Sequence, residues 1–373
     1  MMQPAQMDNQ EWNKAISFLN GGHILQSWEW GEFKDKYSWK VRRFIWKDKQ
    51  EMKILAAAQI LERTVTVFRI NLEMKILYIP RGPLLIDWNN ASLFRTVIAD
   101  LKNYAAKQHA IFIKIDPEVI IEAEDIQMFR VNSQINGEEI RRRLRTEGWQ
   151  YSPEQIQFKN TAWINLLPDE GEILESMKQK TRYNLHLSER KGVKIHIATQ
   201  DELPTLYDLY MKTSNRDGFI IRPIEYYLSL WQVLISKNMA SGLIAEVDGV
   251  PVAGLILFHF ARKAWYFYGM SSELNREKMP NYLLQWEAIR LSKKLGCEIY
   301  DLWGAPDKLD GNDPMWGVYR FKLGLGGKLI KTIGAWDYPV NKIIYSIYNY
   351  VLPKILSFFR FFRSRQIRRE IVN

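Results

Sequence analysis

The stretch of sequence best suited to chemistry runs from residue 317 to residue 331. It holds four glycines, three lysines and an arginine. Glycine lets the backbone approach a ligand closely, and a lysine held in such a place is a fixed positive charge. Phe321, Leu323 and Leu325 alternate as in a β-strand. We therefore predict that Lys322 projects to the opposite side, into a cleft where it meets developing negative charge. The same residues also fit a glycine-rich hairpin with solvated lysines.

Motifs for metal ions and nucleotide cofactors are missing from the sequence. There is no His-x-x-x-His or Cys-x-x-Cys pair, no P-loop, no Gly-x-Gly-x-x-Gly and no Gly-x-Ser-x-Gly. The turns at residues 80–83 and 276–280 lack the successive glycines that would wrap a coenzyme A pyrophosphate. We therefore expect no metal and no resident cofactor. What remains is a set of lone basic, acidic and phenolic groups near strand ends, suited to binding an anion and stabilising an oxyanion: Lys34, Asp116, Arg222, Tyr226, Tyr268 and Lys322.

The composition is that of a globular chain with a basic excess. Its 373 residues are enough for two domains, and 47% of them are hydrophobic. The single cysteine, Cys297, excludes internal disulfides and fits a reducing cytoplasm. Residues 1–20 lack the pattern of a secretory signal. The net charge of +10 is compatible with a polyanionic partner.

The hydrophobic pattern predicts an α/β fold in which one unit occurs twice. In the first half, helices are predicted at residues 8–19, 27–37 and 91–107, and strands at 39–47, 53–63, 76–80 and 110–117. In the second half, strands are predicted at 242–247, 252–260, 264–269 and 297–306, with a helix from 281 closed by Gly296. Strand, helix, strand, acid and proline thus occur in the same order twice, which indicates an internal duplication. Chance similarity between two common patterns is the alternative.

Two basic segments could contact polyanions. Residues 177–194 predict an amphipathic helix whose basic side chains would either face solvent or contact phosphates of a nucleic acid. The candidate nucleic-acid contacts are Lys178, Lys180, Arg182, Arg190 and Lys191. Residues 341–373 combine aromatic, aliphatic and basic side chains, and their longest charge-free run, 343–353, is too short to span a bilayer. This tail suits a helix in the interface of an anionic membrane, or one that docks on the body.

An ordered set of motifs resembles the Fem-type peptidyltransferases, which add amino acids from aminoacyl-tRNA to the peptide stem of peptidoglycan precursors. The motifs extend from residue 25 to about 340, so the resemblance covers nearly the whole chain. They are found at residues 25–34, 112–117, 178–193, 266–272, 300–306 and 317–327.

The resemblance implies two tandem acetyltransferase-like domains with mixed sheets and no coenzyme A. The first would comprise residues 1–160, completed by a returning strand within 327–340, and the second 161–326; residues 341–373 form the basic tail. Departures from the family pattern are His186, at a position that is usually arginine, and the missing room after Lys178 for a long helical arm.

The resemblance also implies roles for single residues. Lys34 matches the lysine that contacts the diphosphate of the precursor, and Arg222 with Tyr226 matches an arginine–tyrosine pair for the same substrate. Tyr268 or Tyr266 matches a tyrosine that lines the substrate site; the motif does not decide between them.

For the reaction itself, the resemblance implies that Lys322, after Phe321, stabilises the transition state. Asp116 matches an acid near the cleft whose role as a base is doubtful. The expected function is transfer of an amino acid from aminoacyl-tRNA to a stem-peptide amine of a UDP-linked or lipid-linked muropeptide, by a cytoplasmic or peripheral-membrane monomer. The alternatives are an acyl-CoA-dependent N-acyltransferase and a non-catalytic RNA-binding protein at the membrane.

Overall fold

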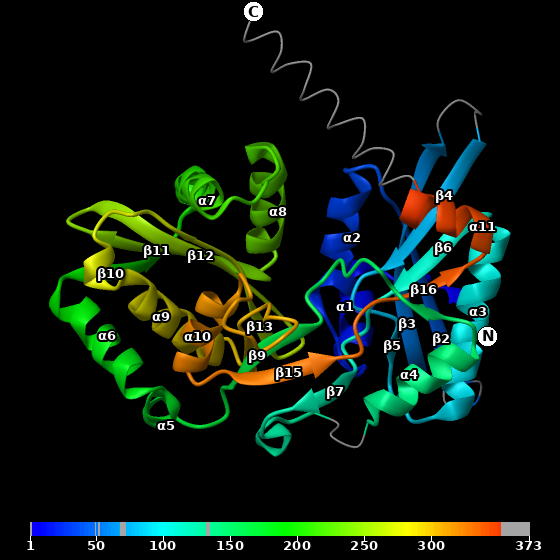
Figure 1. The fold of residues 1–373 in the computed structure, drawn as a ribbon, viewed down its shortest axis with the longest axis horizontal. Coiled ribbons are helices and arrows are strands. Elements are labelled where there is room, and N and C mark those ends of the chain that lie inside the picture. The colour runs from blue at the N-terminus through cyan, green and yellow to red at the C-terminus, as the bar shows by residue number, and fades with distance from the viewer. Residues whose placement is uncertain (1, 49, 51–52, 68–71, 132–134, 352–373) are drawn as a thin grey trace, which may run out of the picture.

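Two mixed sheets, each with helices packed on it, form the right and left halves of Figure 1. The structure is a computed structural model that describes residues 2–48, 50, 53–67, 72–131 and 135–351. The first sheet has the order β1-β2-β3-β4-β6-β16-β8, with β5 paired to β3, and the second has the order β10-β11-β12-β13-β14-β9-β15-β7. The strands of the first sheet are β1 (Gln3–Pro4), β2 (Lys40–Lys47), β3 (Ile54–Val67), β4 (Leu72–Ile79), β5 (Leu84–Leu85), β6 (Ala110–Ile115), β8 (Gln150–Tyr151) and β16 (Trp336–Pro339). Those of the second are β7 (Ile120–Ala123), β9 (Asn160–Asn165), β10 (Val193–Ile197), β11 (Ala240–Val247), β12 (Val250–Phe260), β13 (Lys263–Ser271), β14 (Ile299–Asp301) and β15 (Lys328–Thr332).

The helices are divided between the two halves in chain order. The first half contains α1 (Asn9–Ser17), η1 (Ile24–Gln26), α2 (Trp28–Asp35), α3 (Ala91–Lys107), η2 (Ile126–Met128) and α4 (Gly137–Thr146). The second half contains α5 (Glu170–Ser176), α6 (Gln179–Arg190), η3 (Gln200–Glu202), α7 (Leu203–Asp217), α8 (Ile224–Ser236), η4 (Arg276–Lys278), α9 (Pro280–Lys294) and α10 (Trp316–Gly324). The π-helix η5 (Ile347–Val351) follows α11 (Lys342–Ser346).

The predicted duplication is present in the topology. In the first sheet, β4 and β6 are parallel and are connected by α3; in the second sheet, β13 and β14 are parallel and are connected by α9. The other strand pairs of both sheets are antiparallel. Each helix packs its apolar face on its own sheet, which gives two separate cores. The tandem α/β architecture is therefore confirmed.

Local signals in the sequence place several element ends correctly. Asp8 caps α1 and forms a capping box with Glu11, and the Ser27 side chain accepts a hydrogen bond from the Trp30 amide at the start of α2. The Asp248-Gly249 turn has positive φ at both residues and connects β11 to β12. These turns and caps are local, which is why the sequence alone could specify them.

The predicted domain boundary is wrong for two strands that cross between the halves. Residues 327–340 were expected to complete the first domain, but β15 pairs with β9 and β7 in the second sheet, and only β16 joins the first. Strand β7, from the first half of the chain, also belongs to the second sheet. Figure 1 shows β7 and β15 at the lower edge, between the two halves. A Cβ at Gly327 would lie 2.8 Å from the Lys322 carbonyl oxygen and 3.2 Å from the Ala162 side chain, so glycine lets the chain pass closely here as it enters β15, which pairs with β9.

The start of the tail docks on the first sheet. Tyr345 of α11 is buried, and its hydroxyl donates a hydrogen bond of 2.8 Å to Asp337, a fully buried carboxylate that also pairs with Lys114. Phe112 packs edge-on against the Tyr345 ring. None of the helices in the described ranges is long and apolar enough to cross a membrane. Residues 352–373, which include most of the predicted basic tail, lie outside the described residues.

We predict that Tyr345→Phe lowers the free energy of unfolding by about 1–3 kcal/mol, because a buried hydrogen bond to a charged acceptor is lost. Tyr350→Phe is the matched control, since Tyr350 lies on the same tail and is half exposed. Urea unfolding of both variants measures the effect. Equal stabilities of the two variants would mean that the Tyr345 hydroxyl does not hold the tail to the body.

Candidate functional site

Lys34 lies between the two halves, at the carboxyl end of α2. Trp30 and Phe33 bury the inner face of this helix, and the Lys34 ammonium reaches across to α8, where it donates a hydrogen bond of 2.8 Å to the Tyr226 hydroxyl. Figure 1 shows α2 and α8 facing one another at the centre of the molecule, and these helices are in contact. Two residues that are 192 positions apart are thus brought together by the packing of the halves.

Arg222 brings a second positive charge to the same tyrosine. Its guanidinium carbon lies 4.8 Å from the centre of the Tyr226 ring, and the Lys34 nitrogen lies 5.4 Å from that centre. Neither cation forms an ion pair with an acidic residue in the described part of the chain. Burial, together with the charge of Arg222, lowers the pKa of Lys34 to about 8. Two like charges without a nearby anion make this place suited to an anionic ligand.

The structure distinguishes Tyr268 from Tyr266. A β-bulge at Phe267 shifts the register, so that Tyr268 pairs with Ile256 but Tyr266 pairs with Leu257. Residues two apart on a strand normally share a face, and the extra residue of the bulge puts these two tyrosines on opposite faces. Tyr268 packs with Tyr226 and its neighbours, whereas Tyr266 packs in the core below α9. Of the two candidates, only Tyr268 is near the Lys34–Arg222 pair.

The predicted strand around Lys322 is wrong, because residues 316–324 form the helix α10. Three alternating apolar positions are too few to distinguish a strand from a helix turn. In the helix, Tyr319 and Lys322 are three residues apart and share the buried face, and both are 3% exposed. Phe321 points elsewhere and packs edge-on against Tyr282 of α9. The hairpin alternative is also wrong, since the glycines end a helix.

The Lys322 ammonium is buried and held by backbone. It donates hydrogen bonds to the carbonyl oxygens of Trp303 and Gly304, the second at 2.6 Å. We call these two residues the 303–304 turn; both have positive φ, at 51° and 76°. Burial lowers the pKa of Lys322 to about 7, while the Asp301 carboxylate acts in the opposite direction. An ammonium has three N–H groups, so the described residues leave one of them for another acceptor.

Asp116 is buried, and both of its oxygens are occupied. One accepts a hydrogen bond of 2.7 Å from the Tyr78 hydroxyl and the other accepts one of 2.5 Å from the Arg81 amide. Burial raises the pKa of Asp116 to about 6, against the opposing effect of the Arg81 charge. These contacts hold the turn that follows β4.

Three residues connect the Lys34–Arg222 pair to the turn that holds Lys322: Trp303, Phe267 and Arg81. The sequence analysis did not single them out. The Trp303 ring stacks on Phe267 with centres 4.6 Å apart, and its other contacts include the Arg81 guanidinium, 5.1 Å from the ring centre. Phe267 in turn contacts Tyr268 and Trp30. Arg81 is 3% exposed, and its Nε is buried without a partner. Arg81 and Trp303 belong to segments 80–83 and 300–306, which the sequence analysis considered. Their residue types alone did not predict that the Arg81 guanidinium contacts the Trp303 ring.

Comparison with known proteins decides the family. The sequence profile of the FemAB family matches residues 8–249 and 235–352. The chain belongs to the FemAB family. Among curated relatives, the lipid II:glycine glycyltransferase of Staphylococcus haemolyticus is 22% identical over 95% of this chain and 97% of its own length. The enzyme of the same name from Staphylococcus aureus strain MRSA252 has the same identity and coverage.

Solved structures show the same fold. The crystal structure of FemX superposes with a TM-score of 0.81 at 21% identity, over 92% of this chain and 99% of that one. A tandem GNAT protein from the clavulanic acid pathway superposes with a TM-score of 0.53 at 10% identity, over 91% of this chain and 98% of that one. This FemAB-family chain therefore consists of two tandem GNAT-like units.

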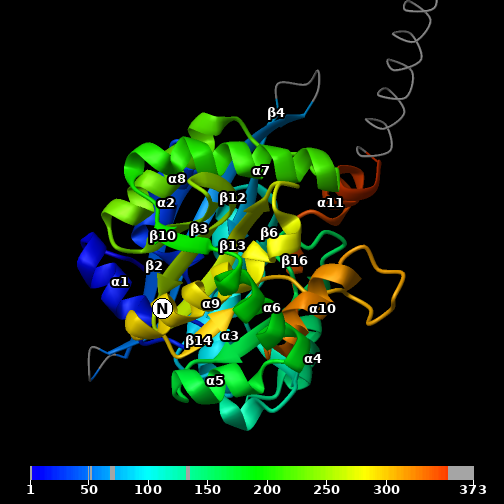
Figure 2. The same cartoon turned by 90° about the vertical axis from the view of Figure 1, so that its left-hand side faces the viewer.

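In this FemAB-family chain the predicted basic helix is α6, and most of its cations are exposed. The exposed ones are Lys178, Lys180, Arg190 and Lys191. Arg182 differs, because its guanidinium donates to the carbonyl oxygens of Glu175 and Met177. His186, the departure from the family motif, is exposed and pairs with Glu189 at 3.0 Å. Figure 2 shows α6 beside α10, and the Lys178 amide donates to the Gly324 carbonyl, so the basic helix adjoins the Lys322 helix.

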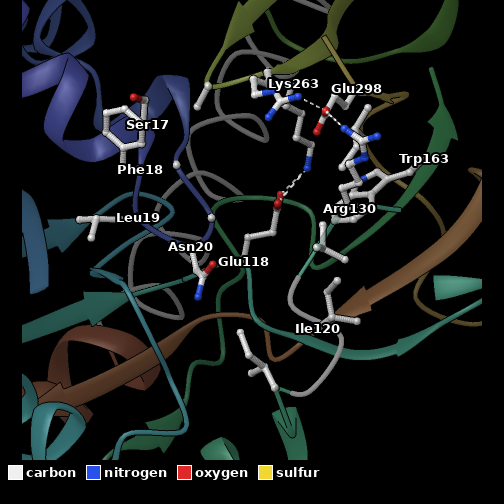
Figure 3. Close-up of a pocket in the computed structure, with 17 residues that line it drawn as sticks. Ser17, Phe18, Leu19, Asn20, Glu118, Ile120, Arg130, Trp163, Lys263 and Glu298 are labelled. Carbon is white, nitrogen blue, oxygen red and sulfur yellow. Dashed lines mark hydrogen bonds and ion pairs between the residues drawn. The ribbon is translucent and has the colours of Figure 1, made fainter. Parts of the chain in front are cut away.

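A cavity of about 280 Å³ lies between the halves, on the side of α1 and β13. Figure 3 shows that Glu118 and Lys263 meet in it, beside Arg130, Trp163 and Glu298. None of the predicted site residues lines this cavity.

We predict that Asp116→Asn removes a pH-dependent destabilisation. With a raised pKa, the folded chain binds more protons than the unfolded chain between about pH 4 and pH 6, so this carboxyl makes stability fall as the pH rises through that range. Relative to wild type, the free energy of unfolding of Asp116→Asn should therefore increase by up to about 3 kcal/mol from pH 4 to pH 7.

Urea unfolding at both pH values measures the difference. Asp208→Asn, at an exposed position on α7, should show no such trend. A difference between Asp116→Asn and wild type that does not change with pH would contradict the prediction.

Proposed function

We propose that this chain transfers an amino acid from aminoacyl-tRNA to the side-chain amine of the stem peptide of a peptidoglycan precursor. Its membership of the FemAB family supports this, as do relatives named lipid II:glycine glycyltransferase that match it over nearly their full length. The buried ammonium of Lys322, with one N–H left unused by the part of the chain that the structure describes, is the observation that carries the proposal. Aminoacyl-tRNA is a co-substrate, and no resident cofactor is needed.

The proposed reaction is aminolysis of an ester. The precursor amine attacks the aminoacyl carbonyl, a tetrahedral oxyanion forms, the amine loses a proton, and the 3′ hydroxyl of the tRNA leaves with a proton. The ester is already activated, so positioning and charge stabilisation account for the catalysis. Lys322 donates its remaining N–H to the oxyanion, in a site from which water is largely excluded. Phe321 packs the opposite side of α10 against α9 and keeps the lysine in place.

The precursor is proposed to bind at the Lys34–Arg222 pair. A diphosphate, whether UDP-linked or lipid-linked, would supply the negative charge that these two cations lack, and Tyr226 with Tyr268 would line the site. The exposed cations of α6 adjoin α10 and are proposed to contact the tRNA backbone. Residues 341–373 are proposed to contact an anionic membrane surface, and binding to vesicles of anionic lipid tests this.

Transfer of a radiolabelled amino acid from charged tRNA to lipid-linked and UDP-linked muropeptides tests the function directly. Titration with acetyl-CoA addresses the acyl-CoA alternative, because tight binding would favour that reaction. Tight binding of tRNA without any transfer would instead favour a non-catalytic RNA-binding protein.

We predict that Lys322→Ala and Lys322→Met lower kcat by about a hundred- to a thousand-fold, with little change in precursor affinity, as expected for a lost oxyanion donor. In the wild type, kcat should rise with pH while the acceptor amine loses its proton, and this rise should level off near pH 7, where the ammonium of Lys322 becomes neutral. Steady-state kinetics from pH 5.5 to 9 measure both effects. Lys328→Ala, a half-exposed lysine of the same stretch, is the control. Near-wild-type turnover of Lys322→Met would remove the role assigned to Lys322.

We predict that Arg222→Ala and Lys34→Ala each weaken precursor binding about 10- to 100-fold, because a charge-assisted hydrogen bond is worth roughly 1.5–3 kcal/mol. Wild-type affinity should fall as the pH rises through about 8, where Lys34 loses its charge. Calorimetric titration with a UDP-linked muropeptide measures the dissociation constants. Arg216→Ala is the control, since Arg216 is already paired with Asp217. Unchanged affinity in both variants would count against this binding site.

A further inference from the structure

The Asp301 carboxylate at the end of β14 is a buried hub. It is 1% exposed, and it accepts hydrogen bonds from the Thr161 hydroxyl, from the Trp163 indole at 2.8 Å and from the Trp303 amide at 2.9 Å. The Lys263 ammonium lies 3.0 Å from the same carboxylate. A buried carboxylate is tolerated only when it is paired and hydrogen-bonded, and Asp301 meets both conditions. Strands β9, β13 and β14 are thereby tied to one group.

Lys263 extends this hub into the other half of the molecule. Its ammonium contacts both oxygens of Glu118, at 2.8 and 2.9 Å, and lies 3.9 Å from the centre of the Trp163 ring. Glu118 lies between β6 of the first sheet and β7 of the second, where the chain crosses from one half to the other. Figure 3 shows the Lys263–Glu118 contact inside the cavity between the halves. One lysine therefore bridges two carboxylates that come from different halves.

The hub also determines the conformation of the 303–304 turn. Trp303 has a φ of 51°, which is costly for a residue with a side chain and persists only where the surroundings hold it. Asp301 holds its amide, and Phe267 holds its ring. With the turn in this conformation, its two carbonyl oxygens converge on the Lys322 ammonium.

We propose that Lys263 is a positioning residue for the transfer reaction. By bridging Glu118 and Asp301, it ties both halves to the 303–304 turn. The 303–304 turn then holds Lys322 at the reaction centre. This proposal rests on the proposed function, in which Lys322 is the oxyanion donor.

The charges around the hub predict the direction in which each substitution shifts the protonation of Lys322, and this direction can be measured. Two carboxylates and Lys263 leave one net negative charge, which the Lys322 ammonium balances. Around α10 lie Tyr282 from α9, Thr181 from α6, Asp301 from β14 and Glu124, whose charge acts on Tyr319 of α10. Asp301 is the acid whose charge acts on Lys322. Removing the charge of Glu118 leaves Lys263 to neutralise Asp301 alone, so Lys322 loses its proton more easily. Removing the charge of Lys263 has the opposite effect.

The test compares Glu118→Gln with wild type. Glutamine keeps an oxygen that can accept from Lys263, and Glu118 borders a cavity, so this variant is expected to fold. The pH at which kcat levels off should move down by a few tenths to about one pH unit, with KM for the precursor unchanged. Lys263→Met should move this break to higher pH. Opposite shifts from two substitutions in one ion-pair chain would not result from general loss of packing.

A second readout is independent of the transfer assay. The 13Cε resonance of Lys322, assigned by its loss in Lys322→Met, reports the protonation of this lysine without substrate. Its midpoint should move in the same directions in Glu118→Gln and Lys263→Met. Glu122→Gln is the matched control, because Glu122 also pairs with a lysine, Lys331 at 2.9 Å, but on an exposed strand edge.

The outcomes separate the two proposals. Opposite shifts of the resonance, with none in Glu122→Gln, support the positioning role even if the wild type shows no transfer, a result that would contradict the proposed function only. If the wild type transfers amino acids but Glu118→Gln leaves both the resonance and the kcat profile unchanged, the positioning role of Lys263 is overturned. The same holds if the two variants shift in one direction.

Discussion

The burial of one carboxylate, Asp301, is the constraint on which the centre of the molecule depends. A charge removed from water must be matched by donors, and here the donors come from β9, β13 and the 303–304 turn. Satisfying the carboxylate therefore determines where three strands meet and how the turn bends. Because the turn carries the carbonyls that hold Lys322, the electrostatic cost of burying Asp301 and the placement of Lys322 are consequences of the same packing.

The site concentrates positive charge where the protein provides little to balance it. Lys322 and Lys34 both have lowered pKa values, and Arg222 lies beside Lys34 without an acidic partner among the described residues. Such an arrangement lowers the stability of the free protein, since desolvated cations and like charges are unfavourable. In the proposed function, the anions that bind there, a diphosphate and a developing oxyanion, supply the missing negative charge. The same groups therefore disfavour the empty site and favour the occupied one, which is how binding energy is used in catalysis.

The comparison of predicted and observed elements separates local from non-local information. The helix starts near Asp8 and Ser27, and the strand pair on either side of Asp248, were predicted correctly because the capping or turn group is next to the element in the sequence. Lys322 was assigned to a strand, because a helix of nine residues rich in glycine and aromatic residues has too few apolar positions to show its period. The burial that makes it helical is provided by α9 and the 303–304 turn, which the local pattern does not contain.

By itself, the sequence determined the repeated α/β unit, the family and the candidate site residues Lys34, Arg222, Tyr226 and Lys322. Each of these follows from the types of residues that are close together in the sequence. Only the tertiary structure decided which chemical groups meet. The bulge at Phe267 brings one tyrosine to the site and turns its neighbour away, β7 and β15 cross to the second sheet, and the ion-pair chain through Lys263 joins the halves. Each of these depends on hydrogen bonds and charges between residues far apart in the chain. Such contacts cannot be predicted from the hydrophobic periodicity or the motif spacing of the sequence.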